Sequence, residues 1–208
     1  MRIVAESLKW LFPGFRVADL GRLFRVWSGS SLALAAIALL DRHIGSPVGL
    51  PLLIGSFGAS AVLVFGAPSS PLARPRNVLG GHVLSALVGV VCAIGLGHMP
   101  WLASGLAVGT SILLMSATGT LHPPGGATAL IAVTGGEGIR QLGFLYVVVP
   151  CLTGALFLLG CSLLLSVLDE WGRLTGVCLI RNREALAQPR RLKRRVVLLR
   201  QLRRLQTF

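Results

Sequence analysis

Two histidines, His82 and His122, are the residues of this sequence best suited to chemistry. His122 stands directly before Pro123 and Pro124, His82 follows two glycines, and both lie in long apolar stretches. An imidazole gains or loses a proton close to neutral pH, so a pair of histidines in an apolar interior can relay a proton. Each histidine also has a structural explanation: His122 can bond a nearby carbonyl group and rigidify its turn, and His82 can make a hydrogen bond between helices.

The side chains that usually accompany a catalytic histidine are missing around this pair. The sequence has no carboxylate between Asp41 and Glu137, no serine or cysteine in a recognisable nucleophile motif, and no His, Asp and Glu cluster spaced for a metal. We therefore expect no enzyme activity, no metal and no cofactor. An enzyme that uses His122 and His82 is the least favoured alternative.

Glycines and small polar residues recur at two places that match each other. Residues 58–64 and 126–132 align at an offset of 68, with glycine and alanine identical and Ser60 aligned with Thr128. A shorter match pairs residues 85–87 with 154–156. These matches predict two halves, about 26–98 and 101–168, the second inverted relative to the first because each half has three elements. Chance matching in a sequence rich in glycine and alanine is the alternative.

Each matched segment predicts a short helix that begins near a glycine. A helix N-terminus carries about half a positive charge and N–H groups without partners, so two opposed N-termini predict a site for a small anion. Two prolines suit the start of the second helix, since they have no N–H group to satisfy. The substrate-binding candidates are Ser56, Phe57, Gly58, Ser60, His122, Pro123, Pro124, Gly125, Gly126 and Thr128.

A second group of candidates, for the pathway or a relay, lies in and after a proline-rich loop. Arg74 and Arg76 could draw an anion to one mouth, although a signal that keeps this loop in the cytoplasm explains them equally well. Asn77 is expected to cap the helix that follows, and His82 completes the group. Packing is the favoured role of Phe57, and bonds to their own helix backbone are the alternative for the hydroxyl groups.

The distribution of charge indicates where these residues must lie. The chain of 208 residues is 53% hydrophobic and 13% charged, and residues 77–136 contain no Asp, Glu, Lys or Arg. A spanning helix needs roughly 20 apolar residues, so this stretch alone holds about three crossings, which excludes a soluble domain. The formal charge of +13 gathers toward the two ends of the chain, so it is not by itself a sign of nucleic-acid binding.

We expect an all-α, polytopic membrane bundle of six elements. The apolar stretches are 26–40, 44–67, 78–97, 101–116, 127–133 and 144–168, the fifth being short and broken. Four crossings, with the second and fifth stretches re-entering the membrane, are the alternative. The predicted domains are an amphipathic interfacial arm (1–25), the transmembrane domain (26–168) and a basic amphipathic tail (169–208).

The cations also predict orientation and partners. With six crossings the arm, the loop at Arg74 and the tail fall on one side, which the positive-inside rule places in the cytoplasm. We expect a bacterial inner-membrane protein with both termini cytoplasmic. The tail, with ten cations after residue 180, is expected to dock on anionic lipid headgroups. The expected partners are a small anion and lipid, without nucleic acid, and the sequence leaves a homo-oligomer open.

Three motifs in order resemble the HPP family of integral membrane proteins, named for its His-Pro-Pro motif. They are GSFGASAV at 55–62, PLARPRNVLGGH at 71–82 and LHPPGGATAL at 121–130, and the resemblance covers residues 26–168. Plastid and cyanobacterial members are associated with nitrite transport, so the resemblance implies a small-anion transporter with nitrite as the leading substrate. The family is usually described with four membrane helices rather than six elements. Some members carry CBS domains after the membrane region, which we do not expect here.

A membrane scaffold or sensor that acts through the basic tail is the alternative function. Deleting residues 182–208 separates the two hypotheses, because transport should survive the deletion and a scaffold or sensor should lose its output.

Overall fold

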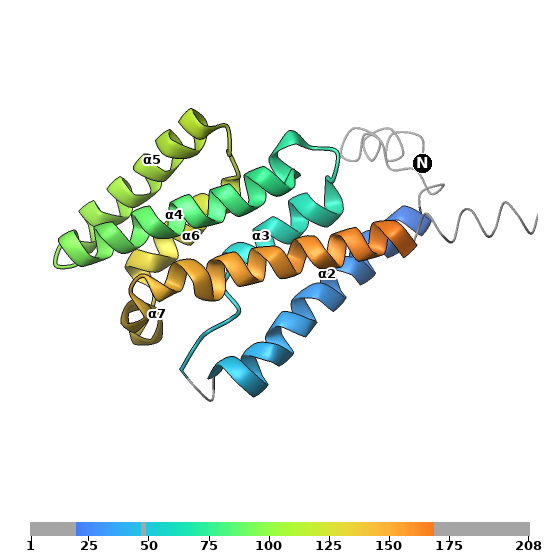
Figure 1. The fold of residues 1–208 in the computed structure, drawn as a ribbon, viewed down its shortest axis with the longest axis horizontal. Coiled ribbons are helices and arrows are strands. Elements are labelled where there is room, and N and C mark those ends of the chain that lie inside the picture. Colours follow the sequence, from blue (N-terminus) through green and yellow to red (C-terminus); the bar gives the residue numbers. More distant parts are fainter. Residues whose placement is uncertain (1–19, 47–48, 169–208) are drawn as a thin grey trace, which may run out of the picture. The chain divides into compact units, whose positions relative to one another are not determined.

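The computed structural model describes residues 20–46 and 49–168, which form helices joined by short loops, with no β-strand in these two ranges (Figure 1). The long helices are α2 (Leu20–Leu40), α4 (Pro75–Leu96), α5 (Pro100–Thr118) and the helical segment Val147–Leu168. The shorter elements are η2 (Asp41–Gly45), α3 (Ser56–Ala61) with its continuation η4 (Val62–Gly66), η5 (Pro71–Ala73), α6 (Pro123–Thr134), α7 (Glu137–Leu142) and η6 (Val147–Leu152). Most of the predicted arm and the whole predicted tail lie outside the described residues.

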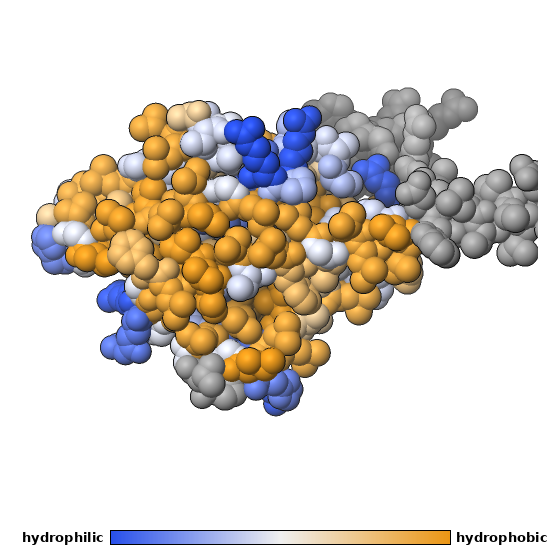
Figure 2. Space-filling view, viewed as in Figure 1, coloured by the Kyte–Doolittle hydropathy of each residue, from blue (hydrophilic) through white to orange (hydrophobic). Residues whose placement is uncertain are grey.

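Four helices are long and apolar enough to cross a membrane, by their length and composition. They are Gly21–Gly45, Pro75–Leu96, Pro100–Thr118 and Val147–Leu168. Large apolar side chains on them point outward; Leu32, Ile94 and Leu113 are 66–67% exposed. Figure 2 shows apolar residues over most of the visible face, with hydrophilic residues gathered at its margins. Because hydrocarbon is the medium that favours such a surface, the prediction of a helical membrane protein is confirmed.

Two short helices account for the difference between six expected elements and four candidate spans. In the second expected stretch, 44–67, the first residues belong to η2, which continues α2, and the short helix begins only at Ser56. Between them, the N–H groups of Leu52 and Leu53 donate to the Asp41 carboxylate instead of continuing a helix. The fifth is α6, whose first two positions are prolines. Both short helices agree with the prediction that each matched segment forms a short helix near a glycine.

Small residues allow α4, α5 and α6 to pack closely. α4 contacts α5 and α6, and α6 contacts α5. A Cβ atom at Gly89 of α4 would lie 2.7 Å from the carbonyl oxygen of Ala129, and one at Gly125 of α6 would lie 2.8 Å from that of Gly81. Glycine is therefore required where these backbones meet, as in other membrane-helix interfaces. The same interfaces bury a cluster formed by Ala103, Ala107, Ala129 and Val133.

Replacing Ser111 with alanine is expected to stabilise the protein. The hydroxyl group of Ser111, in α5, is fully buried and has no hydrogen-bond partner among the described residues. Such an unsatisfied group costs about 1–3 kcal/mol, so the melting temperature of the purified protein in detergent should rise by a few degrees. A lower melting temperature would show that this hydroxyl group makes a stabilising contact.

Candidate functional site

A buried cluster of polar side chains, centred on His82, lies where α3, α4 and α6 meet. His82 lies two turns into α4. The Oγ atom of Ser60 is 2.8 Å from Nε2 of His82 and 3.0 Å from Nε2 of His122. All three side chains are fully buried. One hydroxyl group from α3 therefore bridges two imidazoles that are far apart in the sequence.

The other ring nitrogen of His82 bonds to a second pair of hydroxyl groups. Nδ1 of His82 is 2.7 Å from Oγ1 of Thr128, which is 2.9 Å from Oγ of Ser56. Oγ1 of Thr128 also lies 3.2 Å from the carbonyl oxygen of Pro124, one turn earlier in α6. His82 is thus bonded on both sides, to α3 through Ser60 and to α6 through Thr128.

These contacts define the relative direction of the two short helices. Ser56, at the start of α3, contacts Thr128 in the second turn of α6. Ser60, one turn further along α3, contacts His122, which stands just before α6. The two helices therefore run antiparallel, with their first turns beside each other.

His122 has the structural role that the sequence allowed, and it also contacts the cluster. Its Nδ1 atom is 2.9 Å from the carbonyl oxygen of Leu72 in η5. A carbonyl oxygen only accepts hydrogen bonds, so Nδ1 of His122 donates this one. Residue 122 is also the extended N-cap residue of α6, with φ −140° and ψ 104°. His122 thus fixes the turn before α6 and at the same time reaches Ser60 of the cluster.

Aromatic rings close one side of the cluster. The ring of Phe57 meets that of His82 edge to face, with centroids 5.5 Å apart and planes at 68°, and the two imidazoles meet at 5.2 Å and 62°. Phe57 is fully buried. It packs against Gly154, where any Cβ atom would collide with the ring. These contacts are those of a packing residue, and they exclude water from this side of His82.

Three N–H groups at the two helix starts have partners within the chain. In α3 the N–H groups of Phe57 and Gly58 donate to carbonyl oxygens three residues earlier, and in α6 the N–H of Gly125 donates to His122. The two prolines of α6 have no N–H group. These three N–H groups are therefore not available to a bound anion.

The three candidate glycines have different surroundings. Gly125 is packed against α4 and α5, because a Cβ atom there would lie 2.8 Å from the carbonyl oxygen of Gly81 and 3.0 Å from Sδ of Met115. Gly58, in contrast, is exposed with nothing within 4 Å of a Cβ position. Gly126 is half-buried, and the nearest atom to its Cβ position is 3.8 Å away. Backbone that a ligand could approach is thus found at Gly58 and Gly126, the two aligned glycines.

Arg76 and Asn77 connect the start of α4 to the loop that leads into α6. Nη2 of Arg76 donates to the carbonyl oxygen of Thr118 at 2.6 Å, and Nδ2 of Asn77 donates to that of Leu121 at 2.9 Å. Both side chains therefore hold the segment that positions His122.

The prediction that Asn77 caps the helix is wrong. α4 begins at Pro75 and its N-cap residue is Arg74, so Asn77 lies inside the first turn. Proline is favoured at the first helical position because its fixed φ and missing N–H group cost nothing there. The side chain of Arg74 is exposed.

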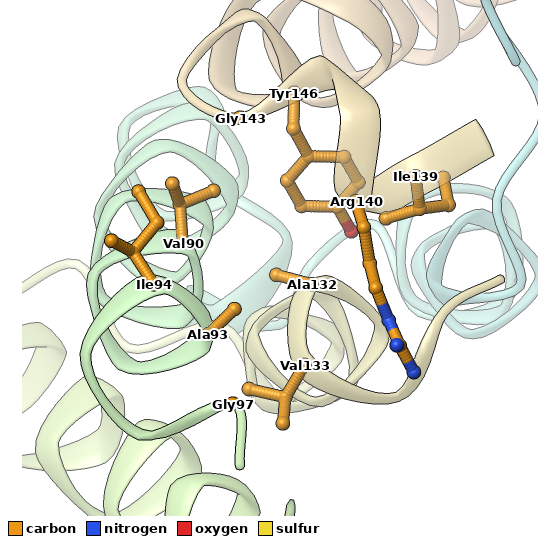
Figure 3. Close-up of a pocket in the computed structure, with 10 residues that line it drawn as sticks. All are labelled: Val90, Ala93, Ile94, Gly97, Ala132, Val133, Ile139, Arg140, Gly143 and Tyr146. Carbon is orange, nitrogen blue, oxygen red and sulfur yellow. The ribbon is translucent and has the colours of Figure 1, made fainter. Parts of the chain in front are cut away.

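A pocket of about 250 Å³ lies at the other end of α4 and α6 from His122 (Figure 3). Tyr146 on its wall turns its hydroxyl group toward α6 and donates to the carbonyl oxygen of Thr128 at 3.0 Å. Arg140 lines the same pocket, and its Nε donates to the carbonyl oxygen of Gly135 at 3.1 Å. The pocket thus adjoins the cluster through Tyr146.

Two residues that contribute to the site, Leu72 and Tyr146, were not predicted from the sequence. Leu72 acts through its backbone carbonyl group, which no side-chain motif reveals. Tyr146 is the single tyrosine of the chain and stands at the start of an apolar run, which was a usable signal. Among the described residues, no group of three or more His, Cys, Asp or Glu could hold a metal ion.

Four apolar candidate spans around a buried polar cluster define an integral membrane protein. The chain belongs to the HPP family, whose transmembrane-region model matches residues 16–174. It is 43% identical over 173 residues to one transmembrane protein of Dictyostelium discoideum (80% of this chain, 60% of the relative) and 42% identical over 152 residues to another (72% and 49%). The chain thus spans about half to three fifths of these relatives. No solved structure matches it.

Proposed function

We propose that this protein transports a small inorganic anion across a membrane, with nitrite as the leading substrate. One observation carries the proposal: a buried cluster of two imidazoles and three hydroxyl groups lies among apolar helices, and residues 42–136 contain no carboxylate. Polar and ionisable groups are expensive inside a membrane and commonly mark a transport pathway. Because N–H and O–H donors stabilise negative charge, this cluster favours an anion over a metal cation.

Cations stand at both ends of the proposed pathway. Arg74 and Arg76 lie at the start of α4, and Arg140 lines the pocket at the other end of α4. Positive charge at a mouth raises the local concentration of anions. In this proposal an anion enters at one of these ends and passes the open backbone at Gly58 and Gly126.

The proposed site lies between two inverted repeats, 26–98 and 101–168. Ser60 and Thr128 hold equivalent positions in the aligned segments, and they bond to the two opposite ring nitrogens of His82. If the second repeat is inverted relative to the first, its short helix must run in the opposite direction, and α3 and α6 are antiparallel. Transporters with inverted repeats bind substrate where the broken helices of the two halves meet.

The proposal also covers the orientation of the protein, its membrane and its partners. Both termini are proposed to be cytoplasmic, by the positive-inside rule, and the basic tail to contact anionic lipid headgroups. The relatives reported above are eukaryotic, so the proposed bacterial inner membrane needs its own test. The protein is proposed to be a transporter and not an enzyme, with no nucleic-acid partner, and a homo-oligomer stays open.

Nitrite uptake into proteoliposomes tests the function directly. The purified full chain is reconstituted, nitrite is added outside, and trapped nitrite is measured colorimetrically against protein-free vesicles. We expect faster uptake with protein, and competition by other small anions in the same assay. Uptake no faster than in empty vesicles, for nitrite and for a panel of nitrate, chloride, formate and bicarbonate, would disprove the function.

A further inference from the structure

Five side chains and one carbonyl group form an unbroken hydrogen-bonded chain through the cluster. Its members, in order, are Ser56, Thr128, His82, Ser60, His122 and the carbonyl group of Leu72, and successive atoms lie 2.9, 2.7, 2.8, 3.0 and 2.9 Å apart. The five side chains are at most 1% exposed. We propose that this chain carries one exchangeable proton and that the transported anion moves together with it. The proposal rests on the proposed anion transport.

The neutral chain has a single arrangement of donors and acceptors. The carbonyl oxygen of Leu72 accepts, so Nδ1 of His122 donates, and Nε2 of a neutral His122 accepts. Ser60 gives its one hydroxyl proton to that nitrogen and must therefore accept from Nε2–H of His82. Nδ1 of His82 then accepts from the hydroxyl group of Thr128, whose single proton in this arrangement is turned away from Ser56 and Pro124.

One added proton is accommodated when a single hydroxyl group turns. With a proton on Nδ1 of His82, this nitrogen becomes a donor to Oγ1 of Thr128. The Thr128 hydroxyl group then donates to the carbonyl oxygen of Pro124, 3.2 Å away. Every N–H and O–H group from Thr128 to His122 again has an acceptor, so the bond to Pro124 gives the chain a second complete arrangement that holds one more proton.

Ser60 allows that proton to move between the two imidazoles. Nε2–H of His82 gives its proton to Oγ of Ser60 while the Ser60 hydroxyl group gives its own proton to Nε2 of His122. Afterwards Ser60 donates to His82 and accepts from His122, and it still has one O–H bond. Both imidazoles can thus hold the proton without loss of a hydrogen bond.

The protonated chain has no negative partner in the described part of the protein. α3, α5, α6 and η5 contribute no other titratable side chain, α4 contributes Cys92 and Arg76, and the segment that begins at Tyr146 contributes this tyrosine, Cys151 and Cys161. α2 contributes Arg22 and Arg25. α7 contributes Arg140 and Glu137, and this glutamate is exposed and accepts from Gln141 instead of facing the cluster. An unpaired positive charge in a dry interior is costly. A bound anion removes that cost, so proton and anion each raise the affinity for the other.

This linkage predicts symport of one proton with each monovalent anion. Such a pair moves without net charge, so the pH gradient and not the membrane potential should drive uptake.

Nitrite uptake under two separate gradients tests the coupling. Proteoliposomes with the full chain receive either an acidic exterior, with the potential clamped at zero by potassium and valinomycin, or a membrane potential at equal pH. The rate in protein-free vesicles is subtracted, because nitrous acid crosses bilayers unaided. We expect the pH gradient to raise uptake several-fold, with acidification of the lumen, and the potential to leave it unchanged. Uptake that depends on the membrane potential but not on the pH gradient would disprove the proton coupling, although it would still support anion transport. No uptake under either gradient would overturn both.

Variants at Ser60 test the relay itself. Ser60→Ala removes the bridge between the imidazoles and should lose the part of uptake that the pH gradient stimulates, together with lumen acidification. Ser60→Thr keeps a hydroxyl group and should restore both, whereas Ser111→Ala removes a buried hydroxyl group outside the chain and should behave as wild type. A folded Ser60→Ala protein with full stimulation by the pH gradient would refute the relay. If Ser60→Ala does not fold, the proton coupling is tested by nitrite uptake of the wild-type protein under the pH gradient and under the membrane potential.

Discussion

Replacing His82 with phenylalanine is expected to remove anion uptake while the protein stays folded. The new ring can keep the edge-to-face contacts with Phe57 and His122. Ser60 retains Nε2 of His122 as a partner, and Thr128 retains Ser56 and a backbone carbonyl. The cost is two hydrogen bonds, about 1–3 kcal/mol in total. Because both ring nitrogens are lost, the centre of the proposed site is lost with them.

The expected loss of uptake is at least about tenfold, since a hydrogen bond to a charged group contributes about 1.5–3 kcal/mol. The matched control is Val91→Phe, which adds the same ring to a position of α4 that is 57% exposed. Initial nitrite uptake, normalised to protein that elutes as a folded peak in size exclusion, is the measurement. Wild-type uptake by folded His82→Phe would place the pathway outside this cluster.

Replacing Gly89 with valine is expected to prevent stable folding. A Cβ atom there would lie 2.7 Å from the carbonyl oxygen of Ala129 and 2.7 Å from Cβ of Ala132. Backbone cannot move aside as a flexible side chain can, so α4 and α6 must separate. Overpacking of a close contact commonly costs about 1–3 kcal/mol, and here it also pulls His82 away from Thr128. We therefore expect little folded protein and no uptake.

Gly95→Val is the matched control because it changes the same residue type in the same helix. A Cβ atom at Gly95 meets nothing within 4 Å, so this variant should melt close to wild type. Size exclusion after a series of heating steps compares the two variants. Equal melting temperatures would mean that the close approach of α4 to α6 is not required.

The sequence predicted the membrane character of the protein correctly. The run without charge at residues 77–136 requires a hydrocarbon environment whatever the tertiary structure, because no soluble core hides so many residues. The break before α6 was equally predictable, since Pro123 and Pro124 restrict the backbone locally.

Predictions that depended on distant contacts did less well. The break before α3 depends on Asp41, whose carboxylate accepts from backbone eleven and twelve residues later. Three of the expected N–H donors at the helix starts have partners supplied by the turns themselves. Asn77 resembles a cap in the sequence, but its side chain bonds to Leu121 across the bundle.

By itself, the sequence determined that this chain lies in a membrane, that the backbone breaks before α6, and which imidazoles and hydroxyl groups are available. Only the tertiary structure decided that Ser60 lies between His82 and His122 and that Thr128 bonds the other side of His82. The physical reason is helix rotation. Which face of α4 turns inward is decided by the close backbone contacts at Gly81 and Gly89, and those contacts exist only once α6 is in place.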